Sequence, residues 1–323
     1  MPQKNKKIVV VGSINLDIVA SVVRMPEEGE TITGQQFATY SGGKGANQAV
    51  CAALLGGNVS MVGRLGQDSF AVELRDRLES AGVKTNSVEE VAGPSGTAVI
   101  VVTAAGSNSI IVIPGANAML RPDDLAAYED LFRDASMILA QLEVPLDTVE
   151  QLGRIAQRFN VPFVLDPAPA LALPPSLLET VTWLTPNESE SRVLFEALGH
   201  SNPSGTDLSP TELAQYFLDA GVRNIILKLG AKGFYIAGQD VESTYVASLQ
   251  VEAIDTTAAG DAFNGGFAYA LTHRGLDPLS AARFANAVAA VSVTRPGAQS
   301  SMPSLADVEA ILDLGGLAKS ESV

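Results

Sequence analysis

The most informative stretch of the sequence is a polar turn of small residues, 255–261 (DTTAAGD), which runs directly into an apolar helical pattern. Gly260 has no Cβ, so a ligand can approach the backbone closely there. The first turn of a helix also leaves backbone N–H groups without partners, and the helix dipole favours an anion beside them. Asp261 adds a carboxylate to the same turn, a combination that suits phosphoryl transfer: the amides hold charge on the phosphate while Asp261 takes a proton from the attacking hydroxyl. The alternative is an Asp261 that only caps the helix.

Polar residues follow two apolar runs of the kind that forms buried strands. Residues 7–14 (KIVVVGSI) are typical of a strand buried on both faces, and Asn15 and Asp17 come next. A second run, 136–143 (SMILAQLE), ends at Glu143. Because ligands in open α/β sheets bind at the carboxyl ends of strands, we expect these side chains near a ligand. A turn that uses Asn and Asp for local hydrogen bonds is the alternative.

A second glycine motif, SGGKGAN at residues 41–47, precedes an Ala-rich helical pattern. It is not a P-loop, because Lys44 is followed by Gly45 instead of Ser or Thr and the upstream glycine is missing. The glycines permit close backbone approach, and Asn47 falls one turn into the expected helix. A plain glycine-rich start of a helix is the alternative.

Two further segments carry candidate ligand-binding groups. Asn187 and Glu190 are three residues apart, which places them on one face of a helix that follows another strand. An acidic residue that stabilises the first helical turn would have the same spacing. Residues 223–233 (RNIILKLGAKG) predict a buried strand that ends in a glycine turn.

Composition limits the class of protein. The 323 residues carry a net charge of -15 without a basic tract, which argues against nucleic acid and against anionic membranes. A local nest of amides can still bind ATP. No apolar run reaches transmembrane length, and the first residues lack the apolar region of a signal peptide. The single cysteine, Cys51, lies in an apolar pattern that predicts a buried free thiol, and we therefore expect a cytoplasmic protein.

Taken together, DTTAAGDAFNGG, SGGKGANQA and GSINLD resemble the motifs of the ribokinase family of sugar kinases, and the resemblance extends from Ile8 to about Leu314. It implies one doubly wound α/β domain over residues 1–323, with a mostly parallel sheet flanked by helices. A small inserted β-sheet lid would be formed by about 17–40 and 97–113, each an antiparallel pair of strands. The alternation of strand-like and helical runs agrees with this fold. An isolated small sheet needs a cover for its apolar face, so a homodimer through the lid is expected.

The resemblance implies ATP-dependent phosphorylation of the 5-hydroxyl of D-ribose to give D-ribose 5-phosphate. Asp261 would be the general base, and the amides of Ala258, Ala259, Gly260 and Asp261 would form the anion hole. Residues that match the family's sugar ligands are Asn15, Asp17, Gly42, Gly43, Lys44, Asn47, Glu143 and Asp261.

The resemblance also implies a nucleotide site and a magnesium ion. Mg²⁺ takes few protein ligands, so Glu190 would hold it through water. Asp166 stands where ribokinases often have Asn, and no role follows for it from the resemblance. The ATP-binding residues would be Asn187, Lys228, Leu229, Gly230, Ala231, Lys232, Gly233, Gly260 and Asn286.

A monovalent-cation loop for K⁺ is the last implication of the resemblance. Most ligands would be backbone oxygens, because the Arg295 guanidinium can only donate. An ordinary helix end tied down by Arg295 is the alternative. The loop would combine Asp255, Thr257, Ser292, Arg295, Gly297 and Ser301.

Three other functions compete with this prediction. A kinase of the same family could act on deoxyribose, a nucleoside or fructose phosphate, but GGKGANQA with Asn15 and Asp17 favours free ribose, and a sugar phosphate would want a basic cluster near the lid. A dinucleotide-dependent oxidoreductase would carry G-x-G-x-x-G after its first strand, where this chain has GSIN. A non-catalytic sugar sensor would need neither Asp261 nor an anion hole.

Overall fold

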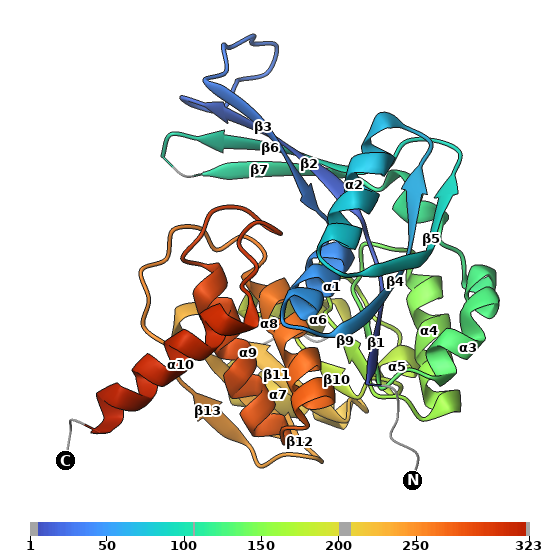
Figure 1. The fold of residues 1–323 in the computed structure, drawn as a ribbon, viewed down its shortest axis with the longest axis vertical. Helices are drawn as coiled ribbons and strands as arrows, with labels where there is room; N and C mark the ends of the chain where they lie inside the picture. The colour runs from blue at the N-terminus through green and yellow to red at the C-terminus, as the bar shows by residue number, and fades with distance from the viewer. Residues whose placement is uncertain (1–5, 106, 200–207, 321–323) are drawn as a thin grey trace.

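The computed structural model describes residues 6–105, 107–199 and 208–320 (Figure 1). Within these residues, nine strands form a central sheet. Its pairs are parallel from β11 to β5, and only β12 and β13 run antiparallel to their neighbours, which confirms the expected mostly parallel sheet. In spatial order the strands are β13 (Thr244–Val246), β12 (Phe234–Gly238), β11 (Asn224–Lys228), β10 (Trp183–Leu184), β9 (Phe163–Leu165), β8 (Met137–Ala140), β1 (Lys7–Val11), β4 (Asn58–Gly66) and β5 (Lys84–Val91).

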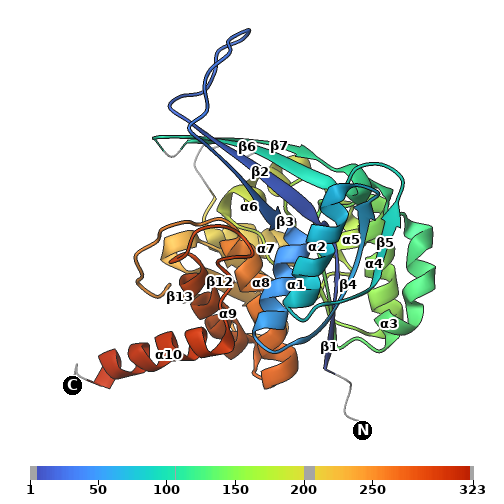
Figure 2. The ribbon, with the colours of Figure 1, turned by 45° about the horizontal axis from the view of Figure 1, so that its top comes forward.

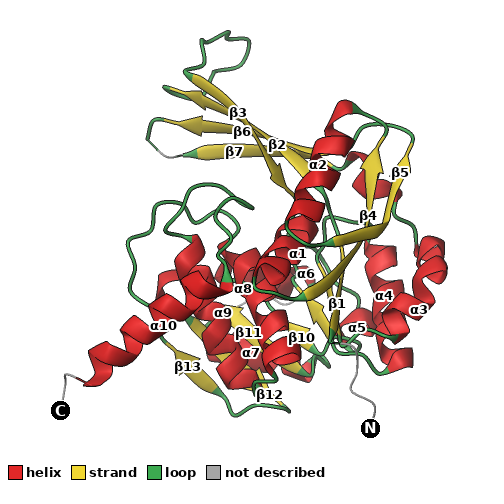
Figure 3. Cartoon of the chain, in the orientation of Figure 1, coloured by secondary structure: helices red, strands yellow, loops and turns green. Residues whose placement is uncertain are grey.

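Helices cover both faces of this sheet, as the doubly wound prediction requires (Figure 3). Strand β1 shows why its apolar run is continuous: Ile8 and Val10 pack into the core on one face, and Val9 and Val11 pack into the core on the other. The first face is covered by α1 (Lys44–Leu54), α2 (Ser69–Ser80), α8 (Ala259–Tyr269), α9 (Pro278–Ser292) and α10 (Leu305–Ser320). The second is covered by α3 (Glu129–Arg133), α4 (Leu146–Phe159), α5 (Pro175–Leu178), α6 (Glu188–Ala197) and α7 (Pro210–Asp219).

A separate four-stranded sheet projects from one end of the molecule (Figures 1 and 2). The pairs β2–β3 and β6–β7 are antiparallel as expected, and β2 and β6 join them by parallel pairing. The strands lie in the order β3 (Gln36–Gly42), β2 (Asn15–Val22), β6 (Gly96–Thr103) and β7 (Asn108–Ile113).

The expected extent of the first strand is wrong. Strand β1 ends at Val11, and Asn15 is already the first residue of β2 in the small sheet. The apolar run could not reveal this break, because Ile14 and Leu16 beyond it are also buried. Asn15 and Asp17 therefore lie at the base of the small sheet, not in a loop after a strand of the central sheet.

Two adjacent glycines in α8 let it lie very close to its two neighbouring helices. A Cβ on Gly265 would lie 2.7 Å from Cβ of Cys51 in α1, and one on Gly266 would lie 2.8 Å from a methyl group of Val288 in α9. Cys51 is a buried free thiol at this crossing, as predicted. The close approach brings the first turns of α1 and α8 together.

A search of the described helices finds none that is both long enough and apolar enough to cross a membrane.

Candidate active site

Asp261 lies in the first turn of α8 with its carboxylate held by two amide side chains from α1. Asn47 donates from Nδ2 to Oδ2 over 2.9 Å, and Gln48 donates from Nε2 to Oδ1 over 3.0 Å. The Asp261 residue is only 5% exposed. The structure thus brings together Asp261 and Asn47, both predicted as site residues, and adds Gln48, which the sequence analysis missed.

Opposing effects set the pKa of Asp261. Burial raises its pKa to about 6, Lys44 opposes the rise, Asp166 adds to it, and the two amide donors lower it. At neutral pH the carboxylate is therefore ionised, yet its proton affinity is close to the working pH, which suits a general base.

The backbone of the same turn offers hydrogen-bond donors. Ala258 precedes the helix in the left-handed conformation with φ of 58°, and the amide of Ala259 bonds back to the oxygen of Thr256 over 3.3 Å. Among the described residues, the amides of Gly260 and Asp261 have no acceptor. These two amides belong to the predicted anion hole and are free to donate to a ligand.

Asp17 lies in a cluster of carboxylates at the base of the small sheet. Its side chain packs on Gly42, where an added Cβ would lie 2.2 Å from Oδ2, so any larger residue at 42 would displace it. Burial, together with the charges of Glu143 and Asp261, raises the pKa of Asp17 to about 7, although Lys44 acts in the opposite direction. The predicted sugar ligands therefore share one electrostatic environment.

Glu143 and Asn15 are each fixed by a residue that the sequence analysis missed. Oε2 of Glu143 accepts from Oγ of Ser13 over 2.5 Å and from the amide of Lys44 over 3.1 Å. Oδ1 of Asn15 accepts from Nδ2 of Asn117 over 2.6 Å. Asn117 lies in a short 3-10 helix (Gly115–Met119), and no motif in the sequence marks it.

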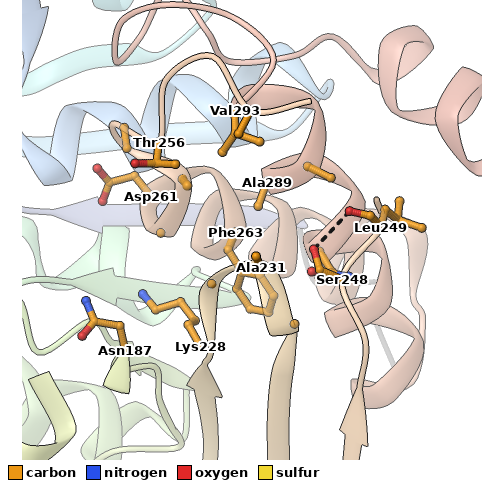
Figure 4. A pocket seen from close by; sticks show the side chains of 18 of the residues that line it. Asn187, Lys228, Ala231, Ser248, Leu249, Thr256, Asp261, Phe263, Ala289 and Val293 are labelled. Carbon is orange, nitrogen blue, oxygen red and sulfur yellow. Dashed lines mark hydrogen bonds between the residues drawn. The ribbon is translucent and has the colours of Figure 1, made fainter. Parts of the chain in front are cut away.

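A cavity of about 440 Å³ opens between the end of β11 and the start of α8 (Figure 4). Asn187 and Lys228 lie on one side of it, and Thr256 and Asp261 lie on the other (Figure 4). Other predicted ATP residues that line it are Gly230, Ala231, Gly233, Gly260 and Asn286.

Two residues predicted to bind ATP do not line this cavity. Leu229 is buried in the core on the opposite face of the sheet, as its apolar side chain requires. Lys232 is largely exposed, and its Nζ lies 3.9 Å from Oε1 of Glu188. Gly230 and Gly233 of the same turn line the cavity with their backbones, because glycine has no side chain.

Asn187 and Glu190 form a reciprocal cap at the start of α6. Oδ1 of Asn187 accepts from the amide of Glu190, and Oε2 of Glu190 accepts from the amide of Asn187, each over 2.8 Å. Both residues also line the cavity. Burial raises the pKa of Glu190, and Lys228 opposes the rise. The capping interaction thus fixes a carboxylate at the edge of the cavity.

Asp255 joins the two segments of the predicted cation loop. Oδ1 accepts from the amide of Thr257 over 2.9 Å, and Oδ2 accepts from the amide of Gly297 over 2.8 Å. Burial would raise the pKa of Asp255, but these hydrogen bonds hold it below its ordinary value.

Three of the other predicted members of the loop use their side chains elsewhere. Arg295 pairs with Asp307 at 3.0 Å, and the hydroxyls of Ser292 and Ser301 donate to carbonyls of their own turns. The described residues contain no group of three or more His, Cys, Asp or Glu side chains that could hold a metal ion.

Comparisons with known proteins identify the family of the chain. Residues 5–305 match the model of the pfkB family carbohydrate kinases. The chain is similar to the ribokinase of Bacillus subtilis, with 39% identity over 95% of this chain and 99% of that one, and to the deoxyribokinase of Salmonella typhi, with 40% identity over the same shares. The structure of Arabidopsis thaliana ribokinase complexed with ribose and ATP matches with a TM-score of 0.84 and 33% identity, over 94% and 98% of the two chains. The chain belongs to the pfkB family of carbohydrate kinases.

Proposed function

We propose that the protein transfers the terminal phosphate of ATP to the 5-hydroxyl of D-ribose and releases D-ribose 5-phosphate. The observation that carries this proposal is the first turn of α8, where the carboxylate of Asp261 lies beside the open amides of Gly260 and Asp261. The turn lines a cavity of about 440 Å³, and Lys44, which is proposed for the sugar site, lines the same cavity. Ribokinase relatives, and the complex of one with ribose and ATP, support the choice of substrates.

The chemistry follows from this geometry. Asp261 accepts the proton of the attacking hydroxyl, with Asn47 and Gln48 orienting its two oxygens. The open amides of Gly260 and Asp261 hold the charge that spreads over the transferred phosphate. Little covalent help is needed, because positioning and electrostatic stabilisation supply most of the acceleration in phosphoryl transfer.

The sugar would lie between the small sheet and α1. Asp17 and Glu143 offer carboxyl oxygens as acceptors for hydroxyl groups, and Lys44 and Asn47 offer donors from the start of α1. Asn15, Gly42 and Gly43 complete the proposed sugar site.

ATP would occupy the cavity, with Asn187 and Glu190 near its phosphates. The donor set fits Mg²⁺, because Glu190 presents a carboxylate to the cavity while its cap fixes the helix that carries it. When bound, Mg²⁺ would neutralise charge on the phosphates. K⁺ is proposed for the loop at Asp255, whose ionised carboxylate contacts both segments and so fits a cation held mainly by backbone oxygens.

We also propose a homodimer through the small sheet. Its surface exposes large apolar side chains, among them Phe37 at 70% and Ile111 at 63%, and exposed apolar patches of this kind mark contact surfaces. Analytical ultracentrifugation of the wild type and of Ile111→Glu would test this, with a shift to monomer expected for the variant. The buried thiol of Cys51 suits a reducing compartment, which supports the cytoplasm as location.

One substrate panel tests the main proposal. ADP release would be followed with ribose, 2-deoxyribose, fructose and nucleosides as acceptors, and kcat/KM should be highest for ribose. The similarity to a deoxyribokinase makes 2-deoxyribose the second candidate. A higher kcat/KM for 2-deoxyribose would replace ribose as the substrate, and no turnover with any sugar would overturn the proposal.

A further inference from the structure

Asp166, a residue with no role in the site described above, connects the nucleotide side of the site to the sugar side. It follows β9 and is only 3% exposed. Oδ1 accepts from Nζ of Lys228 over 3.0 Å, and Oδ2 accepts from Nε2 of Gln48 over 3.0 Å. One buried carboxylate thus holds an ammonium group with one oxygen and an amide with the other.

Lys228 extends from the last position of β11 toward the turn that carries Asp261 (Figure 4). A Cβ placed on Gly260 would lie 3.1 Å from Nζ of Lys228. The ammonium group is therefore next to the open amides of the first turn of α8, in the cavity where a phosphate would lie. An ammonium group has three hydrogens, so two remain for phosphate oxygens after one is donated to Asp166.

Gln48 completes the connection to the general base. Its Nε2 donates to Asp166 and to Asp261, each over 3.0 Å, so both amide hydrogens are used. Gln141 donates from Nε2 to Oε1 of Gln48 over 2.7 Å, which fixes the orientation of the Gln48 amide. A displacement of Asp166 would therefore change the positions of both Lys228 and Asp261.

We propose that Lys228 is a catalytic cation that contacts the transferred phosphate, and that Asp166 is a positioning residue that holds Lys228 and, through Gln48, Asp261 in their working geometry. This inference rests on the phosphotransferase function proposed above. Holding the ammonium group in place before ATP binds matters, because a preorganised charge needs no rearrangement during the reaction. Burying an ammonium group without a partner would be costly, and the charge of Asp166 offsets part of that cost.

The first test is Lys228→Gln, which keeps a polar side chain, one atom shorter than that of lysine, and removes its charge. We expect kcat to fall by roughly 10²-fold, as when one oxyanion-stabilising donor is removed. Calorimetry should show affinity for a non-hydrolysable ATP analogue falling about tenfold, with ADP affinity nearly unchanged, because ADP lacks the phosphate that Lys228 contacts. Equal losses for both nucleotides, or none, would contradict the assigned contact.

The second test is Asp166→Asn. The Asn amide has one acceptor for two donors, Lys228 and Gln48, so one contact must be lost. We expect lower kcat at unchanged KM for the sugar. The acid limb of the pH–rate profile should also move to lower pH, because the charge of Asp166 raises the pKa of Asp261. Substitution of a residue needed only for folding would leave the pH of this acid limb unchanged.

A matched control lies at the start of β11, the strand whose last residue is Lys228. The carboxylate of Asp240 accepts from Arg223 over 2.7 Å and from Asn224, the first residue of β11, over 2.8 Å. Asp240→Asn breaks a similar carboxylate–cation pair away from the cavity, so it should lower the melting temperature and leave kcat, KM and the pH profile unchanged.

A double variant, Asp166→Asn with Lys228→Gln, tests whether the two residues act as a unit. Its loss in kcat should be smaller than the product of the single losses, since both singles disturb one interaction. Multiplicative losses, or wild-type kinetics for Asp166→Asn, would overturn the positioning role. The proposed kinase activity would survive either result. The kinase proposal would fail only if the wild type phosphorylates no sugar. In that case the comparison of ATP-analogue and ADP binding would still test the contact of Lys228 with the terminal phosphate.

Discussion

Nδ2 of Asn47 lies 2.9 Å from Oδ2 of Asp261, although 214 positions separate the two residues in the chain. The contact exists because α1 and α8 cross closely at Gly265, where a Cβ would meet Cys51. Oδ1 of Asn47 has no hydrogen-bond partner among the described residues, so its amide is directed by the Asp261 carboxylate alone. The geometry of the candidate base is therefore set by the packing of two helices.

Asp261→Asn should abolish most turnover while the fold and substrate binding persist. A general base contributes roughly 10²–10⁴-fold to the rate, so kcat should fall by at least about 10²-fold. Steady-state ADP release and calorimetry with each substrate would measure the two effects. Near wild-type turnover in a correctly folded variant would reduce Asp261 to a helix cap.

The same variant should be more stable than the wild type at pH 8. Burial raises the folded-state pKa of Asp261 from 3.8 to about 6, so ionisation of this carboxyl disfavours the folded state as pH rises through that window. The amide of the variant carries no charge, so the cost of burying a charge at position 261 disappears. Asn47 can rotate its own amide so that its oxygen accepts from the new amide group. Urea unfolding should show a stability gain at pH 8 that shrinks as pH falls toward 4. A gain that is independent of pH would contradict the raised pKa.

Turnover of the wild type at saturating substrates should fall below about pH 6. Protonation of Asp261 removes the acceptor for the hydroxyl proton, and its pKa is raised to about 6 by burial, with Lys44 acting in the opposite direction. Values of kcat measured in buffers from pH 4.5 to 8 at constant ionic strength would define the acid limb of the pH–rate profile. A limb near pH 4 would mean that the carboxylate is solvated in the working enzyme.

Asp17→Ala should weaken the sugar and leave ATP binding almost intact. A hydrogen bond to a charged group is worth about 1.5–3 kcal/mol, so sugar affinity should fall by roughly 10- to 100-fold. Wild-type affinity should also decline as pH falls through 7, because burial and the charge of Glu143 raise the pKa of Asp17 to about 7 and its protonated form is a weaker acceptor. Calorimetry at several pH values would measure both; unchanged sugar binding in the variant would remove Asp17 from the site.

Activity in KCl should exceed activity in NaCl at equal ionic strength. Asp255 bonds to the amides of Thr257 and Gly297, and a cation at this point would stiffen the turn that carries the open amides. Asp255→Ala should lower activity in K⁺ and reduce the difference between the salts. Equal wild-type rates in KCl, NaCl and tetramethylammonium chloride would exclude the cation site and leave the kinase function untouched.

The sequence by itself determined the features that depend on neighbours along the chain. Three such features are the start of α8 just before Asp261, the cap formed by Asn187 and Glu190, and the glycine turn after β11, because each follows from residues a few positions apart. Local hydrogen bonds and backbone preferences set such features, so their patterns are visible in the sequence. The alternation of strand-like and helical runs indicated a mostly parallel sheet covered on both faces.

Only the tertiary structure decided which groups meet. Gln48 and Asp261 are 213 positions apart, and Lys228 and Asp166 are 62 apart, yet each pair shares a hydrogen bond. Periodicity shows that a residue faces the interior, but the partner it meets there depends on strand order and helix crossings. The break between β1 and β2 stayed hidden because the apolar residues before it (Val11), within it (Ile14) and after it (Leu16) are all buried. The network around Asp166 could not be predicted because its members converge only when the parallel strands place their carboxyl ends at one edge.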